Sequence, residues 1–188
     1  MHSSTLWSSK AGCVLCSAEM ADIDALSIVG ATDADLARVA ELAGVIWRRH
    51  YPGIITHEQI DYMLGHGYSH AALSRFIQEE GAGLDLAWMN GRFIGFSAYH
   101  RAGARELKIE KLYVHQDYQR CGVGRRLIAR AEEAAREQSR TAIILNVNKN
   151  NLQAIRAYEK SGFAIREAVV VDIGSGFVMD DYVMTKPL

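Results

Sequence analysis

The apolar residues in the first third of the chain recur at the spacing of amphipathic helices. A short apolar run occupies residues 26–29. N-cap candidates at 32–35 then predict a helix that ends near His50, and the same periodicity predicts two shorter helices over 58–64 and 71–80. This part of the chain is therefore expected to be mostly helical.

In the middle of the chain the apolar residues alternate with polar ones, which indicates β-strands. The alternation predicts strands over 84–89 and 92–100, joined by an Asn-Gly turn, and a third strand over 106–114. Because the connections are short, these three strands are expected to form an antiparallel meander.

The last third of the chain alternates helices with strands. An amphipathic helix over 122–138 leads to a nearly continuous apolar run over 142–147, which is typical of a buried strand parallel to the third strand through a right-handed crossover. A helix over 151–161 and a hairpin of 163–172 with 177–184 follow. We therefore expect a mixed α/β fold, in which an antiparallel meander precedes a parallel strand-helix-strand unit and a C-terminal hairpin.

The composition describes one globular domain with little net charge. The chain has 188 residues, and its 21 Lys plus Arg against 22 Asp plus Glu leave a formal net charge of -1. This balance argues against nucleic acid or a membrane as a partner, and no apolar run approaches the roughly 18 residues that span a bilayer. We expect a cytoplasmic protein.

The first residues of the chain do not follow the pattern of the domain. Residues 1–22 show no helical or strand period and are expected to be a disordered tail or a remnant of cloning, ahead of a single domain over 23–188. Cys13 and Cys16 have the spacing of half a zinc site. No second pair of ligands follows, so no metal is expected.

A turn with two glycines joins the third strand to the following helix. Gly122 and Gly124 stand at the start of that helix. The unpaired N–H groups of its first turn and the positive end of its dipole make an anion site. The main-chain amides of 120–125 are expected to cradle a phosphate group, and Arg120 and Arg125 add positive charge at the rim.

The spacing around these glycines excludes the two common nucleotide motifs. Neither G-x-x-x-x-G-K-[ST] nor G-x-G-x-x-G is present. A magnesium-bound nucleoside triphosphate and a dinucleotide hydride carrier therefore lack their fingerprints, and a different pyrophosphate carrier is required. An ordinary glycine-containing turn between a strand and a helix is the alternative interpretation.

A second polar cluster follows the parallel strand. Asn151, Ala154 and Tyr158 lie at i, i+3 and i+7 of the next helix, so an amide and a phenol share one helix face. The two parallel strands are expected to end side by side at Val114 and Asn146, where an open α/β sheet holds its ligand. Both clusters then line the same cleft.

These residues resemble the GNAT superfamily of acyl-coenzyme A-dependent N-acetyltransferases. The resemblance covers roughly residues 25–188. It rests on segments that look like the family's two core motifs in the right order and spacing: Leu112-Tyr113-Val114, Gln119-x-x-Gly122-x-Gly124, and the run from Asn146 through Asn151, Ala154 and Tyr158 to Gly162-Phe163. The segments 54–64 and 172–182 are similar to a bacterial branch that includes polyamine acetyltransferases.

The resemblance implies a site for acetyl-coenzyme A. The backbones of Leu112 and Val114 would bind the pantetheine, residues 119–125 would hold the pyrophosphate, and Asn151 would contact the pantetheine or the phosphate arm. Cys121 departs from the family, which more often has a small, basic or otherwise unreactive residue there. The coenzyme-binding residues expected are Leu112, Tyr113, Val114, Gln119, Arg120, Cys121, Gly122, Val123, Gly124, Arg125, Asn146, Asn151, Ala154 and Tyr158.

Acetyl transfer to an amine needs a base, an oxyanion site and an acid for the leaving thiolate. Tyr158 falls at the family's general-acid position, and the Val114 N–H is expected to bind the thioester oxygen. Glu110, four residues before Val114 and expected on the same side of the strand, is the preferred base. Glu106, acting through water, is the alternative base. Direct transfer is expected, so Cys121 is not required as a nucleophile.

The acceptor is expected to be a small cationic amine such as spermidine. The candidates for the edge of its pocket are Trp47, His50, Tyr51, Tyr62, Asp180, Asp181 and Tyr182, and the acidic residues among them favour a cation. Two alternatives stay open: a non-catalytic acyl-coenzyme A binding or sensing module, and an enzyme that acetylates protein N-termini or lysines. Edge strands would also allow two chains to pair as a homodimer.

Overall fold

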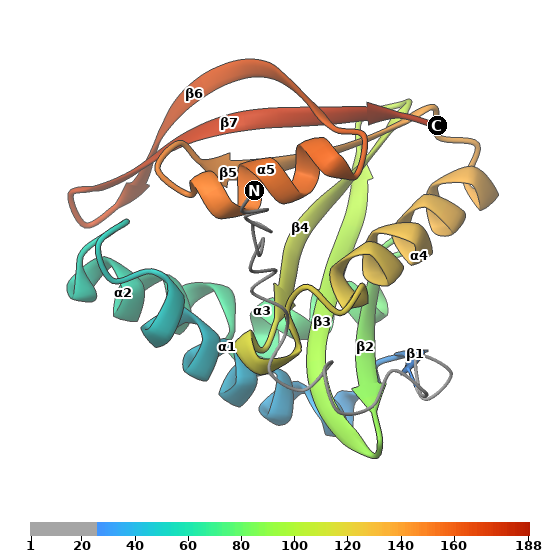
Figure 1. Cartoon of the computed structure of the whole chain (residues 1–188), viewed down its shortest axis with the longest axis horizontal. Coiled ribbons are helices and arrows are strands. Elements are labelled where there is room, and N and C mark those ends of the chain that lie inside the picture. Colours follow the sequence, from blue (N-terminus) through green and yellow to red (C-terminus); the bar gives the residue numbers. More distant parts are fainter. Residues whose placement is uncertain (1–25) are drawn as a thin grey trace, which may run out of the picture.

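A single mixed sheet forms the centre of the molecule. The computed structural model describes residues 26–188, and the expected tail over 1–22, with Cys13 and Cys16, lies outside them. Seven strands pair in the order β1-β2-β3-β4-β5-β7-β6 (Figure 1). Within residues 26–188, β4 and β5 are the one parallel pair and every other neighbour is antiparallel. The α/β fold class is confirmed.

The strands agree with the predicted ones to within a few residues. They are β1 (Leu26–Gly30), β2 (Gly83–Met89), β3 (Arg92–Ala102), β4 (Glu106–Val114), β5 (Ala142–Asn148), β6 (Ala164–Gly174) and β7 (Phe177–Pro187). The predicted meander of β2, β3 and β4 is present, and β1 extends it by pairing with β2. The hairpin folds back on itself, so that β7 pairs with β5 and β6 becomes the outer strand.

The helices also begin and end close to their predicted bounds. They are α1 (Leu36–His50), α2 (His57–Gly67), α3 (His70–Gln78), α4 (Val123–Glu137) and α5 (Leu152–Lys160). The side chains of Thr56 and Ser69 cap α2 and α3 by accepting backbone N–H bonds from Gln59 and Ala72. Among the described residues, no helix combines the length and the apolar character that crossing a membrane requires.

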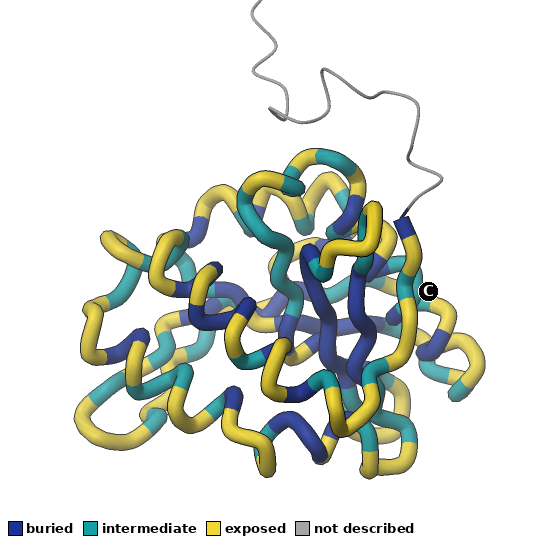
Figure 2. The backbone as a smooth tube through the Cα atoms, turned by 90° about the horizontal axis from the view of Figure 1, so that it is seen from below, coloured by how far each residue is buried: buried dark blue, intermediate teal, exposed yellow. Residues whose placement is uncertain are grey.

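The helices form two layers, one on each face of the sheet. Helices α1 to α3 cover one face, where Val39 and Phe76 join a buried cluster with Phe96 of β3. Helices α4 and α5 lie on the other face, where Ala131 packs in a cluster with Leu107 of β4. Figure 2 shows the buried central strands between these mostly exposed outer segments. The amphipathic periods of the sequence are therefore satisfied against a common sheet.

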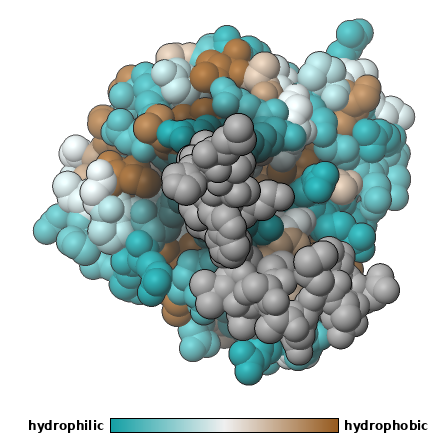
Figure 3. Space-filling view, viewed as in Figure 1, coloured by the Kyte–Doolittle hydropathy of each residue, from teal (hydrophilic) through white to brown (hydrophobic). Residues whose placement is uncertain are grey.

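Strand β6 is an exposed edge of the sheet. The exposed fractions of Ile165, Val170 and Val171 are 47%, 67% and 47%. Figure 3, seen from the same side as Figure 1, shows apolar side chains along the top of the molecule, where β6 and β7 lie. The open backbone edge and these side chains leave β6 able to pair with another strand.

The parallel ladder between β4 and β5 is short. It joins residues 106–109 of β4 to residues 142–145 of β5 and ends there. The expectation that both strands end side by side at Val114 and Asn146 is therefore wrong. Beyond the ladder the two strands diverge, and none of the described strands pairs with the edge of β4 that faced β5.

A β-bulge in β4 lies at the point of divergence. Tyr99 of β3 pairs with Ile109 and Ala98 pairs with Lys111, which leaves Glu110 as the extra residue. A bulge increases the local twist and reverses the alternation of the side chains that follow it. The strand can therefore turn away from β5 while its other edge stays paired with β3.

Gly95 allows β3 to run close to the end of β4. A Cβ atom at this position would lie 2.7 Å from the backbone oxygen of Tyr113 and 3.3 Å from Cα of Val114. We predict that Gly95→Ala lowers the free energy of unfolding by about 1–3 kcal/mol, because these backbone atoms must shift. Denaturant unfolding measures the change.

Gly30→Ala, at the end of β1, is the matched control. A Cβ atom there would meet nothing within 4 Å, so its effect should stay within about 0.5 kcal/mol. Equal stabilities of the two variants would contradict the steric role of Gly95.

Candidate active site

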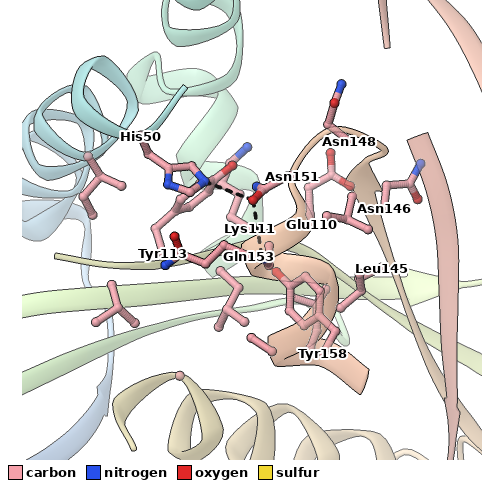
Figure 4. A pocket seen from close by; sticks show the side chains of 18 of the residues that line it. His50, Glu110, Lys111, Tyr113, Leu145, Asn146, Asn148, Asn151, Gln153 and Tyr158 are labelled. Atoms are coloured by element: carbon pink, nitrogen blue, oxygen red, sulfur yellow. Dashed lines mark hydrogen bonds between the residues drawn. The ribbon is translucent and has the colours of Figure 1, made fainter. Parts of the chain in front are cut away.

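A large cavity occupies the gap where β4 and β5 diverge. Its volume is about 1060 Å³, and its walls come from α1, α2, β4, the glycine turn, β5, α5 and the β6–β7 hairpin. Figure 4 shows side chains from these separate elements converging on it. The cavity therefore lies where the sequence predicts a ligand cleft, but between diverging strands.

Most of the predicted site residues line this cavity. Those in the wall are Glu110, Leu112, Tyr113, Val114, Gln119, Arg120, Gly122, Gly124, Arg125, Asn146, Asn151, Ala154 and Tyr158. Two predicted residues of the glycine turn lie outside the wall. Val123 is 1% exposed and joins the core with Leu127, and Cys121 is half-buried against the same cluster. Only their backbone groups are therefore able to serve a ligand in the cavity.

The glycine turn has the backbone shape of an anion site. Arg120 (φ 63°) and Gly122 (φ 82°) both adopt the left-handed region, and Gly122 is the N-cap of α4 without a side-chain cap. The first N–H groups of α4 have no acceptor within the helix. A Cβ atom on Gly122 would meet nothing within 4 Å. The turn thus exposes donors beside open space, where a phosphate is able to bind.

Gln119 ties this turn to both neighbouring elements. Its Nε2 donates to the backbone oxygen of Val114 at 3.1 Å, and its Oε1 accepts from Nε2 of Gln153 in α5 at 3.0 Å. The end of β4, the turn and α5 are therefore held in one arrangement along the cavity.

Asn151 begins α5 and joins it to α1. Its side chain is 5% exposed, and Oδ1 accepts from the backbone N–H of Ala154 at 3.2 Å. Nε2 of His50 lies 3.2 Å from the same oxygen (Figure 4). One oxygen of Asn151 therefore caps α5 while the residue also lines the cavity.

Tyr158 carries its phenol into the cavity wall from α5. Its ring packs edge-on against Phe163, with ring centroids 5.8 Å apart. Burial raises the pKa of the Tyr158 hydroxyl to about 12. The phenol is therefore protonated at neutral pH and is available as a proton donor.

Glu110 is held by three basic side chains. Lys108, His100 and Arg75 lie 3.1, 3.5 and 3.9 Å from its carboxylate. The His100 hydrogen bond, with the charge of Lys108, keeps the Glu110 pKa well below its usual value despite burial. Such a carboxylate holds its charge firmly and is a weak proton acceptor.

The expected common side of Glu110 and Val114 is wrong. Glu110 is directed toward Arg75 of α3, whereas Val114 packs with Val123 and Leu127 on the face covered by α4. The physical cause is the bulge at Glu110, which breaks the two-residue alternation that the sequence argument requires.

Aromatic residues at and beyond the end of α1, together with Tyr113 of β4, form the floor at one end of the cavity. The Trp47 ring lies 4.4 Å from Tyr51 and 5.8 Å from Tyr113, measured between centroids, and Trp47 Nε1 donates to the Tyr68 hydroxyl at 3.1 Å. Burial raises the pKa of Tyr51 and Tyr113 well above the usual value. Both hydroxyls are therefore neutral hydrogen-bonding groups.

Helix α2 and the tip of the β6–β7 hairpin close this end. The Tyr62 hydroxyl donates to the backbone oxygen of Ile173 at 2.5 Å, and Gln59 Nε2 donates to the backbone oxygen of Val178 at 2.9 Å. Met63 of α2 and Met179 of β7 line the cavity inside this contact. This end of the cavity is thus covered by elements that are far apart in the sequence.

The seven acceptor-pocket candidates divide into two groups. Trp47, His50, Tyr51 and Asp181 lie in the cavity wall. Tyr62, Asp180 and Tyr182 lie outside it: Tyr62 supports the roof, Asp180 pairs with Lys149, and Tyr182 packs against the core under α5. Neighbours on a strand face opposite ways, which separates Asp181 from Asp180 and Tyr182.

Sequence reasoning missed Lys111 and Tyr68. The Lys111 ammonium lies 4.6 Å from the Tyr68 ring centroid, and burial lowers the Lys111 pKa to about 8. Both residues line the cavity. The periodicity of β4 carried no signal for Lys111, since its direction depends on the bulge one residue earlier.

The chain matches the acetyltransferase (GNAT) family over residues 40–163. An uncharacterized N-acetyltransferase of Mycobacterium bovis is 26% identical over 157 residues, which cover 84% of this chain and 99% of the relative. The spermidine N(1)-acetyltransferase of Thermoplasma acidophilum is 26% identical over 150 residues, which cover 78% of this chain and 90% of the relative.

A solved structure shares the fold. The crystal structure of the PaiA N-acetyltransferase of Thermoplasma acidophilum, in complex with coenzyme A, has a TM-score of 0.75 and 23% sequence identity, and the comparison covers 87% of this chain and 99% of that one. The matched family region contains the diverging strands, the glycine turn and α5, which build most of the cavity. The chain therefore belongs to the GNAT family and is an acyl-coenzyme A-dependent N-acetyltransferase.

Proposed function

We propose that this enzyme transfers an acetyl group directly from acetyl-coenzyme A to the primary amine of a small molecule. The observation that carries the proposal is the continuity of one cavity from the glycine turn, along the unpaired edge of β4, to the roofed aromatic end. A diphosphate, an extended amide arm and an acceptor fit these three parts in that order.

Backbone groups of the enzyme are proposed to bind two polar parts of the coenzyme, the diphosphate and the pantetheine. The N–H groups of residues 120–125 take the diphosphate, since this turn presents donors and a helix N-terminus. Leu112 and Val114 form hydrogen bonds to the pantetheine, because their strand edge has no partner from β5. Asn146, Asn151 and Ala154 line the opposite wall. The thioester then lies between β4 and Tyr158.

The chemistry requires a neutral amine, a stabilised oxyanion and a protonated leaving group. The Val114 N–H binds the developing oxyanion, a contribution of about 3 kcal/mol for a well-placed donor. Tyr158, with its pKa raised to about 12, keeps its proton until the thiolate leaves and then donates it. A thiolate of pKa roughly 8.5 is a weaker base than the Tyr158 phenolate, so this donation must be coupled to the return of a proton to Tyr158 from the attacking nitrogen.

A small acceptor is supported by the roof over the aromatic end. The Tyr62 and Gln59 hydrogen bonds hold the hairpin over this end of the cavity, which favours an acceptor small enough to fit beneath it. The Thermoplasma acidophilum relative is named for spermidine, a small amine, which agrees with this class. We therefore prefer a small amine to a protein lysine or N-terminus.

The expected cytoplasmic location and homodimer stay predictions. The exposed edge strand β6, with Val170 and Val171, supports pairing of two copies through this edge.

The acceptor class is tested by thiol release. We predict that acetyl-coenzyme A and a panel of small primary amines give free coenzyme A and acetylated product, whereas lysine peptides give at most about a tenth of that rate. Mass spectrometry identifies the acetylated product. Release with peptides alone would contradict the roofed-pocket proposal.

Tyr158→Phe tests the acid role. We predict that kcat falls by about 100-fold or more, because the leaving thiolate loses its proton donor, while calorimetry finds the Kd for coenzyme A within about twofold of wild type. Tyr182→Phe is the matched control, since Tyr182 lies outside the cavity wall. An unchanged kcat for Tyr158→Phe would refute the role.

Gly122→Ala tests the diphosphate site. An alanine at φ 82° is strained, and its methyl group would enter the open space beside the start of α4. We predict that the Kd for coenzyme A rises by about tenfold or more, whereas the Kd for pantetheine, which has no diphosphate, changes little.

Gly176→Ala is the matched control for backbone strain. Gly176 has φ 79° with nothing within 4 Å of its would-be Cβ, and it lies in the hairpin turn outside the cavity wall. Its coenzyme affinity should match wild type. Equal losses of affinity in the two variants would assign the effect to strain alone.

A further inference from the structure

The aromatic end of the cavity contains a carboxylate that forms no ion pair with a basic side chain of the described residues. Two acidic residues, Glu110 and Asp181, line the cavity. Glu110 is already paired with Lys108, His100 and Arg75. Within residues 26–188, Asp181 makes no ion pair, and its Oδ1 has no hydrogen-bond partner. Among the described residues of this wall, Asp181 is therefore the acid that is not already paired with a basic side chain.

The backbone around Asp181 holds it firmly in place. Strand β7 lies between two neighbours, and Asp181 pairs with Asn148 of β5 on one side and Val169 of β6 on the other. The residue is 2% exposed. An unsatisfied buried acceptor costs free energy, so a ligand that donates a hydrogen bond here gains more than it would at the surface.

The groups that face Asp181 come from several elements. The Asn146 side chain of β5 donates a hydrogen bond to the carboxylate, and Lys108 of β4 and Lys149, after β5, act on it through their charges, as does Asp180. The charge of Asp181 acts in turn on Tyr51, which directly follows α1, and helps to raise the pKa of that hydroxyl. Burial is the largest influence and raises the pKa of Asp181 to about 6.

The remaining charges of this wall are positive. Lys108 is shared with Glu110, and the Lys111 ammonium lies 4.6 Å from the Tyr68 ring and 5.7 Å from the Phe76 ring. A second or third ammonium on the acceptor would meet these cations instead of carboxylates. The aromatic floor of Trp47 and Tyr51 offers apolar contact in their place.

We propose that Asp181 binds the ammonium of the acceptor and accepts its proton, and that the enzyme prefers acceptors with a single ammonium on an apolar or aromatic body to polyamines. This inference rests on the proposed function, since it requires acetyl transfer to a small amine in this cavity. It assigns the proton transfer to a residue other than Glu110.

The proton transfers balance across the reaction. The ammonium gives one proton to Asp181, and the neutral nitrogen forms a bond to the thioester carbon. As the C–S bond breaks, the coenzyme thiolate takes the proton of Tyr158, and the second proton lost by the nitrogen restores Tyr158. Asp181 then releases its proton to water, so that one ammonium and one thioester give one amide, one thiol and one proton.

Asp181→Asn is the direct test, because asparagine keeps the shape and removes the charge. We expect kcat/KM for a monoamine to fall by about 100-fold or more, with the Kd for coenzyme A within about twofold of wild type. Asp61→Asn is the matched control, since Asp61 is an exposed residue of α2 that pairs with Arg48 and lies outside the cavity wall. Wild-type kcat/KM in Asp181→Asn would overturn the assignment.

The pH profile separates this role from a structural one. With Asp181 as the base, wild-type kcat/KM increases with pH up to about pH 6, where Asp181 loses its proton. It is then flat from about pH 6.5 to 7.5, because the ammonium form of the amine is the substrate. In Asp181→Asn, kcat/KM should rise about tenfold per pH unit across this range, following the free amine. A wild-type profile with that same slope would overturn the proposal without any variant.

The stability of the variant gives a second check. A buried carboxylate whose folded pKa is raised is costly in its charged form above that pKa. Asp181→Asn should therefore have a Tm at pH 7.5 no lower than wild type. A lower Tm together with lost coenzyme binding would indicate a structural residue and overturn the proposal.

The acceptor preference is tested with 2-phenylethylamine and spermidine at pH 7. We expect kcat/KM to be at least about tenfold higher for the monoamine. A preference for spermidine would overturn the single-ammonium assignment while leaving acetyl transfer to amines intact. Wild-type enzyme that releases no thiol with any amine would instead overturn the proposed function, and this assignment with it.

Discussion

The divergence of β4 from β5 is the constraint on which the rest of the site depends. The parallel ladder ends after Ile109 and Leu145, and the bulge at Glu110 turns β4 away while its other edge stays paired with β3. Backbone groups beyond this point still require hydrogen-bond partners. The cavity gives an extended, amide-containing ligand access to them, so an irregularity of one residue creates room for a cosubstrate inside an otherwise continuous sheet.

Burial and pairing give the two carboxylates of the cavity opposite properties. Glu110 is surrounded by basic side chains and keeps its charge, whereas Asp181 is buried with few partners and holds its proton more readily. Burial also acts on Tyr158: it raises the pKa of the hydroxyl, which therefore keeps its proton and is able to donate it. An acid, a poised base and a fixed charge therefore occupy one cavity without a metal in the proposed mechanism.

The features that local chemistry specifies were predictable. The helix capped by Thr56, the meander with its Asn-Gly turn, and the glycine turn ahead of α4 all depend on residues close in sequence. The same holds for the shared face of Asn151 and Tyr158 on α5, which the structure places in the cavity wall. The family resemblance rested on these local signals, and the match over residues 40–163 agrees with it.

The sequence by itself determined the kinds of elements, their order and the turn able to hold a phosphate, because periodicity and capping act over a few residues. The tertiary structure alone decided that β7 enters between β5 and β6, that β4 bulges at Glu110, and that Asp181 lies buried beside the cavity. These features depend on pairing between distant strands, and a shift of one residue in that pairing changes which face each side chain occupies.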